Sequence, residues 1–149
     1  MARPTTVKGT KFLLQLGDGG TPEVYSAPCA LTTKGINFSA ESNDFNIPDC
    51  DLPDAAMWTE RVVSALSAGV SGEGTLAMES LPTWWAWYSS ALEKNIRVKV
   101  DVPLASNGGY WSMSAVLTSF NVSANNGELA TVEIEIQSNG EVTWTAAAA

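Results

Sequence analysis

The residues with the most evident chemistry are three aspartates in one short stretch, Asp49, Asp51 and Asp54. Paired carboxylates can act as general acid and base, or can ligate Ca²⁺. An EF-hand loop needs Asp or Asn at its fifth position and Gly at its sixth, whereas Pro53 and Asp54 stand there. Prolines and apolar residues separate the three acids, and no partner base accompanies them. The stretch therefore predicts neither a catalytic site nor a metal site.

Other site chemistry depends on residues that the chain lacks or spaces differently. It contains no His, which removes Ser-His-Asp and Cys-His nucleophile arrangements and the commonest metal ligand. The glycine-rich segment 69–74 lacks the Lys-Ser/Thr pair of a phosphate-binding loop. Cys29 and Cys50 lie far apart without a C-x-x-C pattern, so free thiols are favoured, although a disulfide stays open. We therefore expect no catalytic residue, no metal and no cofactor, and a protein that is not an enzyme.

The net charge of −8 comes from 16 acidic and 8 basic residues. Tight binding to nucleic acid needs clustered Lys and Arg. The densest basic group, Lys94, Arg97 and Lys99, is flanked by Glu93 and Asp101. Nucleic-acid recognition is therefore not expected, and an acidic surface would instead repel DNA and let it pass.

The length of 149 residues fits a single domain with its own core. We expect one domain over 1–149, with an N-terminal arm at 1–10 and a short C-terminal tail at 146–149. No run approaches the roughly 18 to 20 apolar residues that span a bilayer, and the N-terminus lacks the apolar core of a signal peptide. The chain is therefore expected to stay in the cytoplasm where it is made.

Apolar periodicity predicts a mainly β chain with antiparallel strands. Alternation is clearest at 96–102 and 130–136, and further strands are expected at 11–16, 23–31, 36–39, 69–78, 110–122 and 142–145. Asn125-Asn-Gly127 marks a tight turn, and its two flanking strands are expected to form the longest hairpin. Gly72 and Gly74 leave one strand face bare, where another backbone could approach.

One helix is predicted at about 82–94, capped by Ser80 and with Pro82 in its first turn. An apolar stripe at helical spacing would face the core: Trp84, Trp87, Tyr88, Ala91 and Leu92. Trp84, Trp85 and Trp87 could instead form a platform for carbohydrate, but their spacing favours packing.

Residues 42–60 interrupt the β pattern with two prolines and four aspartates. A loop this long is uncommon inside a compact domain and is usually functional. Large apolar side chains are interspersed in it, so it is not a solvated linker: Phe45, Ile47, Leu52, Met57 and Trp58. We expect these side chains to pack either on their own domain or on a neighbour.

The order and spacing of several motifs resemble the tail tube protein, or major tail protein, of siphophages over most of the chain. The motifs are Gly9–Gly20 followed by Thr21–Tyr25, Asp49–Asp54 with Trp58–Arg61, Ser67–Thr75, Lys99–Pro103, Gly109–Trp111 and Ser138–Trp144. The resemblance implies a β-sandwich or barrel-like tail tube fold with one flanking helix. It also implies a structural virion protein of the phage tail.

In that family, six subunits form a ring whose inner sheets join into a continuous β-barrel, and rings stack into a tube. The resemblance therefore implies that this chain's partners are further copies of itself, the tape measure protein, the tail terminator and the distal tail or baseplate proteins. DNA would pass through the tube without sequence recognition, and assembly would take place in the host bacterial cytoplasm. The long loop would reach the neighbouring ring.

The resemblance assigns a ring-stacking role to eight residues of the loop: Asp44, Phe45, Ile47, Asp49, Asp51, Leu52, Asp54 and Trp58. We expect this loop to be disordered in the free subunit and ordered in the tube. Glu133 and Glu135 form a candidate acidic lumen face, with an ordinary solvent face as the alternative. Which strands line the lumen stays open, because the cations of 96–102 would bring positive charge into the channel if that strand faced inward.

Four other functions fit the sequence less closely. The chain could be a tail terminator, a distal tail protein, or another tube-fold part of a phage-like delivery system. It could also be a glycan-binding adhesion module that uses an exposed Trp85. A tube subunit stacks on both sides, whereas a terminator needs only one stacking face.

Overall fold

The computed structural model describes residues 3–20, 22–28 and 31–147. Its strands are β1 (Phe12–Gly17), β2 (Tyr25–Ser26), β3 (Leu31–Asn46), β4 (Thr59–Thr75), β5 (Lys94–Val100), β6 (Gly109–Ser123), β7 (Thr131–Ser138) and β8 (Thr143–Ala146). One α-helix, α1 (Leu81–Ser90), and two single-turn 3-10 helices, η1 (Gly9–Lys11) and η2 (Leu104–Ser106), complete the described chain. The predicted mainly β fold with one helix is confirmed.

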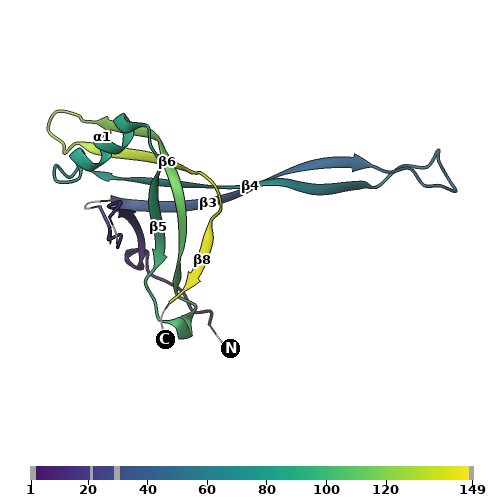
Figure 1. Cartoon of the computed structure of the whole chain (residues 1–149), viewed down its shortest axis with the longest axis horizontal. Coiled ribbons are helices and arrows are strands. Elements are labelled where there is room, and N and C mark those ends of the chain that lie inside the picture. The colour runs from purple at the N-terminus through teal and green to yellow at the C-terminus, as the bar shows by residue number, and fades with distance from the viewer. Residues whose placement is uncertain (1–2, 21, 29–30, 148–149) are drawn as a thin grey trace.

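All paired strands are antiparallel, in the order β2-β1-β5-β6-β7-β4-β3, with β8 also on β6. The first half of β6 pairs with β5, and the second half pairs with β7. Strands β5 and β8 run across the direction of β3 and β4 (Figure 1). The strand β6 thus links two differently oriented parts of one strongly curved sheet.

The core lies on the inner face of this curved sheet. Alternate residues of the strands are buried there, as their period-two pattern predicts. They are Leu14, Leu16, Ala68, Val70, Ile96, Val98, Met113, Ala115, Leu117, Val132, Ile134 and Ile136. Helix α1 adds Trp84 and Trp87, whose rings stack 6.1 Å apart. Among the described residues, no polar or charged side chain is buried.

Helix α1 is shorter than predicted. Ala91 takes a left-handed conformation with φ 56° and donates its backbone N–H to the Tyr88 carbonyl, which ends the helix after Ser90. Lys94 therefore begins β5 instead of closing the helix. Ser80 makes no side-chain cap hydrogen bond.

The helical tryptophans divide between the core and the surface. Trp84 and Trp87 are buried, whereas Trp85 and Tyr88 are exposed. Leu92, predicted for the core stripe, lies beyond the helix and is also exposed. A carbohydrate platform of three tryptophans therefore does not exist on this surface.

Strands β3 and β4 extend far beyond the sheet as a hairpin (Figure 1). Strand β4 pairs with β7 only from Gly69 onward, so 39–46 and 59–67 form a two-stranded segment that we call the ribbon. The connecting loop, 47–58, is called the tip. The loop predicted at 42–60 is therefore shorter, because strands occupy 42–46 and 59–60. The prediction of the longest hairpin at Asn125–Gly127 is wrong, since β3–β4 is longer.

Cross-strand side chains hold the ribbon together along its length. The hydroxyls of Ser39 and Ser67 lie 2.7 Å apart, and the Thr59 hydroxyl donates to the Asn46 amide oxygen at 2.9 Å. Such pairs are the unit of sheet stabilisation. An isolated two-stranded hairpin is nevertheless marginal in water. At its base, Phe38 packs on Trp111 with ring centroids 5.5 Å apart, which ties the ribbon to the body.

The structure also differs from several smaller sequence predictions. Strand β2 spans only Tyr25–Ser26 of the predicted 23–31. A Cβ at Gly72 would meet the side chains of Ile134 and Leu31, and not another backbone. Close backbone approach occurs instead at Gly108, whose position leaves no room beside the Val102 carbonyl. At the ends, η1 lies partly within the expected arm, and Ala146 belongs to β8.

Candidate assembly interface

The apolar side chains of the tip and its approach are exposed to solvent. Trp58 is 91% exposed and Leu52 65%, while Ile47 and Phe45 are each more than half exposed. A monomeric protein rarely leaves such a contiguous set of large apolar groups in water, and such sets mark interaction sites. The loop residues expected to stack thus have no burial within their own chain.

The tip also carries negative charge without compensation. Its twelve residues include Asp49, Asp51 and Asp54 and no Lys or Arg, which gives a formal charge of −3. Asp49 accepts the backbone N–H groups of Asp51 and Leu52 at 2.8 and 3.3 Å, so it shapes the local turn. Asp44, in contrast, lies on the ribbon.

Arg61 compensates Asp44 within the ribbon. Its Nε donates to the Asp44 carboxylate at 3.1 Å, and both side chains are more than half exposed. The eight predicted stacking residues therefore occupy two places: Asp44 and Phe45 lie on the ribbon, and the other six lie in the tip.

The ribbon adds exposed apolar residues that the sequence analysis did not single out. Val62, Val63 and Leu66 are 56%, 57% and 79% exposed. Val62 and Val63 point to opposite faces because they are consecutive in a strand. Both faces of the ribbon are therefore partly apolar. An adjacent pair of β-branched residues in a segment without alternation is the one sequence signal that could have indicated this.

Glu133 and Glu135 point outward from β7, away from the core. Across the sheet, Glu133 lies opposite Glu73 of β4 and Asn121 of β6, and Glu135 lies opposite Ser71. These residues form what we call the acidic face. Glu73 is a third acid here that sequence reasoning missed, although its register with Glu133 could not be read from the chain alone.

The basic residues of β5 lie on a different part of the sheet. The Arg97 guanidinium lies between the rings of Tyr25 and Tyr110, at 3.8 and 4.5 Å from their centroids. Lys99 lies 3.8 Å from the Asp101 carboxylate. Cations stacked on aromatic rings gain electrostatic stabilisation. The positive charge of β5 is thus held beside β1 and β6 and does not extend onto the acidic face.

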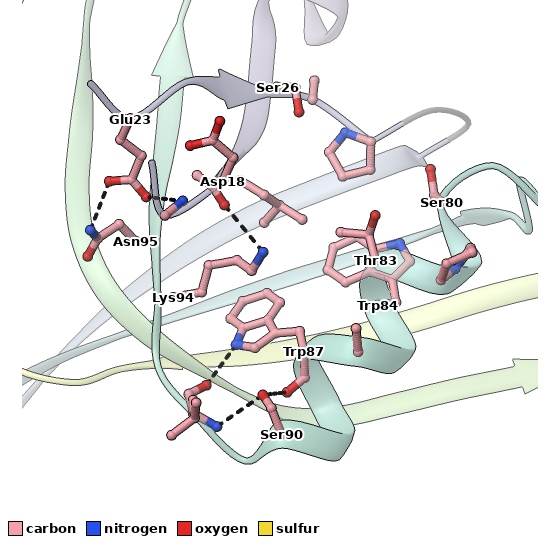
Figure 2. Close-up of a pocket in the computed structure, with 18 of the residues that line it drawn as sticks. Asp18, Glu23, Ser26, Ser80, Thr83, Trp84, Trp87, Ser90, Lys94 and Asn95 are labelled. Atoms are coloured by element: carbon pink, nitrogen blue, oxygen red, sulfur yellow. Dashed lines mark hydrogen bonds between the residues drawn. The ribbon is translucent and has the colours of Figure 1, made fainter. Parts of the chain in front are cut away.

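A surface groove with a volume of about 990 Å³ lies between α1 and the turn after β1 (Figure 2). Asp18 accepts the backbone N–H groups of Gly20 and Val24, which lower its pKa. The amide of Asn95 donates to Glu23 and lowers the pKa of that carboxyl as well. These hydrogen bonds hold the turn in place.

Two further polar groups at this groove are also paired. The Lys94 ammonium donates to the Gly17 carbonyl at 3.3 Å, and the Trp87 indole donates to the Leu92 carbonyl at 3.0 Å (Figure 2). Burial raises the pKa of Tyr25, the ring that stacks on Arg97. The hydrogen bonds at this groove therefore hold the turn after β1 and the end of α1 in place.

Within the ranges that the structure describes, no group of three or more His, Cys, Asp or Glu residues is arranged to hold a metal ion. None of the described helices is long and apolar enough to cross a membrane. Cys50 is an exposed free thiol in the tip, and Cys29 lies outside the described residues, so their pairing is not tested.

A curved β-sheet with one covering helix and a long projecting hairpin defines a mainly β structural subunit. Residues 6–144 match the family described as phage tail tube protein, and the chain belongs to this family. The resemblance found in the sequence is thereby confirmed. No match to a curated protein was found.

Solved structures with this fold come from several kinds of tail. The chain is 18% identical to one in the tail of an empty gene transfer agent particle with C6 symmetry, with a TM-score of 0.78 over 95% of this chain and 100% of that chain. For the SPP1 tail tube, the identity is 11% and the TM-score 0.68, covering 95% and 80%. For the sheath–tube complex of an extracellular contractile injection system, PVC, the values are 14% and 0.64, covering 95% and 93%.

Proposed function

We propose that this chain assembles into hexameric rings that stack to form the tail tube of a long-tailed bacteriophage. The observation that carries the proposal is the projecting ribbon and tip, whose large apolar residues find no burial in their own chain. A tail structure of the same fold has C6 symmetry, which supports six copies in a ring. The role is structural, and we propose no enzymatic activity.

Ring closure would use the two open edges of the sheet that carries the acidic face. This sheet runs from the second half of β6 through β7 and β4 to β3. Strand β3 ends it on one side, and residues 116–123 of β6 have no paired strand opposite β7 in the described chain. Pairing these edges between copies removes sheet edges that would otherwise attract uncontrolled partners.

The acidic face would then line the lumen. Glu73, Glu133 and Glu135 point outward from this sheet. Their charge repels DNA, so DNA passes without sequence recognition during delivery into the host. Before that, the lumen would hold the tape measure protein.

The tips would contact the neighbouring ring, with the tail terminator and the distal tail or baseplate proteins bound at the two tube ends. In this proposal the protein is part of the virion tail and is assembled in the host bacterial cytoplasm. Trp58 and Leu52 are the expected anchors, because buried aromatic and large apolar groups dominate interfaces.

Negative-stain microscopy of the purified full chain tests the proposal directly. We expect rings or tubes with a central channel, formed alone or after addition of an initiator complex. A chain that stays monomeric at high concentration, with initiator present, would contradict tube formation.

A tail terminator is the second candidate, because a chain in the sheath and tube terminator of the PVC injection system has the same fold, with a TM-score of 0.65 and 13% identity. Quantitative mass spectrometry of virions separates the two functions. A tube subunit should be among the most abundant virion proteins, whereas a terminator should be present in only a few copies.

We also propose that the tip orders on assembly, because its anchors lack intrachain partners. Hydrogen exchange should show little protection of 47–58 in the free subunit and strong protection in tubes. Equal protection in both states would contradict this coupling without touching the existence of tubes.

A further inference from the structure

A smaller groove lies far from the tip. It is lined by Gly9, Phe12, Thr32, Thr33 and Lys34, and has a volume of about 310 Å³. The short helix η1 and the start of β1 form one wall, and the first residues of β3 form the other. We call it the basic groove.

The basic groove combines an apolar wall with positive charge. Phe12 is half-buried against the core and offers a ring to the groove. Lys34 lines it, and Lys8 and Lys11 flank the lining residue Gly9. Asp101 is the acid nearest to this wall, since its backbone N–H donates to the Lys11 carbonyl, and its carboxylate is paired with Lys99. Glu73, across the strand from Thr33, faces the other side of the sheet from Lys34. The lysines therefore leave the groove positive.

The tip has the complementary character. It combines exposed Leu52 and Trp58 with the three unpaired carboxylates of Asp49, Asp51 and Asp54. An apolar anchor bordered by acids fits an apolar wall bordered by lysines, since complementary charge steers association and fixes register.

The larger groove beside α1 does not offer this complement. Among its lining residues, Asp18, Glu23, Glu79 and Glu93 outnumber Lys94. Like charges facing each other across an interface are strongly unfavourable, so the acidic tip would be repelled there. Size alone would favour this groove, but its charge argues against it.

The tip and the basic groove lie at opposite ends of β3. Lys34 is near the first residue of the strand and the tip follows its last residue, Asn46. Twelve residues of extended chain separate them by about 40 Å, so a tip cannot fill its own groove. A contact between two different patches on identical copies is heterologous and repeats without closing when the copies are displaced along one direction. That is the geometry that a stack of rings requires.

We propose that the basic groove receives the tip of a second copy in the adjacent ring. The apolar residues Leu52 and Trp58 supply the contact with Phe12, and the tip aspartates lie beside Lys8, Lys11 and Lys34. This inference rests on the proposed tube function and names the surface that the tip occupies.

Cross-linking of assembled tubes tests the assignment, using the native thiol of the tip. In a Cys29→Ser background, Cys50 remains at the tip. Gly9→Cys then places a thiol at the wall of the basic groove, where a Cβ meets no other atom within 4 Å, and Thr83→Cys places one at the rim of the larger groove as a matched control. Tubes of each variant are treated with a short bismaleimide and denatured, and the products are separated by size.

The Gly9→Cys tubes should give a ladder of covalent dimers, trimers and larger species, because each copy contributes one tip and one groove. The Thr83→Cys tubes and the Cys50-only tubes should give monomers. Tubes in which Gly9→Cys yields only monomers, or Thr83→Cys yields the ladder, would overturn the assignment and leave the proposed function intact. Failure of the native chain to form tubes under any condition would instead count against both.

A charge exchange provides a second test that needs no new thiol. Lys34→Glu or Asp51→Lys alone should raise the protein concentration needed for tubes about three- to tenfold, since each replaces attraction by repulsion. The double variant should recover most of the loss. Impaired single variants without recovery in the double variant would contradict pairing between tip and groove.

Discussion

The body and the ribbon of this protein follow opposite rules. In the body, alternate strand residues such as Ile96, Val98 and Ile136 are fully buried, and the described core holds no polar side chain. In the ribbon, Val62, Val63 and Leu66 are all more than half exposed, on both faces. The body obtains its stability from its own chain, whereas the ribbon is built from the same residue types but leaves them in water.

This difference separates folding from assembly within one chain. A body that satisfies its own core can fold before it meets another copy. A ribbon that is marginal alone gains its burial only from a partner. If this division is correct, changes in the ribbon should affect assembly and spare stability, and changes in the body should do the reverse.

Removal of the ribbon should have the largest effect on assembly. Ala40 and Leu66 are direct partners across the hairpin, so replacing residues 41–65 with Asn-Gly closes a two-residue turn at that register. We expect a folded monomer whose near-ultraviolet circular dichroism matches the parent and which forms no tubes in the electron microscope. Tubes formed by this variant would contradict any role of the ribbon in stacking.

The core substitution Ile96→Ala should have the largest effect on stability. Ile96 is 0% exposed, and truncating such a residue costs about 2–5 kcal/mol of unfolding free energy. The matched control, Val62→Ala in the ribbon, should change the free energy by less than about 0.5 kcal/mol. Urea unfolding of both variants at subunit concentrations below assembly measures the difference, and equal losses would contradict the division.

The same division explains what the sequence could predict. Alternation predicted β5 and β7 because one face of each is buried: Val98 and Ile134 are core residues, whereas Lys99 and Glu133 are not. The start of β4 was not predicted, because a strand with no buried face in its own chain has no reason to alternate. A register shift between Glu41 and Ser42 disrupts the pattern further.

Some features of the candidate interface could be predicted from the sequence and others could not. The apolar residues of the tip were singled out because prolines and aspartates surround Leu52 and Trp58 in the sequence, while their packing on their own domain or on a neighbour stayed open. The sequence did not predict that Glu73 lies opposite Glu133, or that Gly9 and Lys34 line the same groove. Both arrangements depend on how distant segments pair in the folded chain. The helix end at Ser90 was missed since Ala91, and not a Gly, takes the left-handed conformation.

Trp58→Ala tests with a single side chain whether the tip contributes to assembly and not to stability. Trp58 is 91% exposed, so its removal should change the unfolding free energy by less than about 0.5 kcal/mol. As an interface anchor, it should raise the concentration needed for tubes about tenfold or more. Trp85→Ala, an exposed Trp on α1 away from the ribbon, is the control and should leave assembly unchanged. Light scattering against concentration compares the variants, and equal assembly of both would argue against the tip as an anchor.

The smallest expected effect lies in the body, at the turn after β1. The backbone N–H groups of Gly20 and Val24 lower the pKa of Asp18 from 3.8, so the folded state favours the carboxylate. A lowered pKa contributes stability that is present above the pKa of the unfolded chain and is lost as the pH falls through the folded value. Asp18→Asn should therefore lower the Tm by about 1–3 °C at neutral pH, a small loss because the group is fully exposed to solvent screening.

The difference in Tm between Asp18→Asn and the parent should shrink toward zero below pH 3.8, and tube formation at neutral pH should not change. A constant difference across that range would mean that Asp18 acts through shape and not through its charge, whereas a loss of tubes would show that the turn belongs to the assembly surface after all.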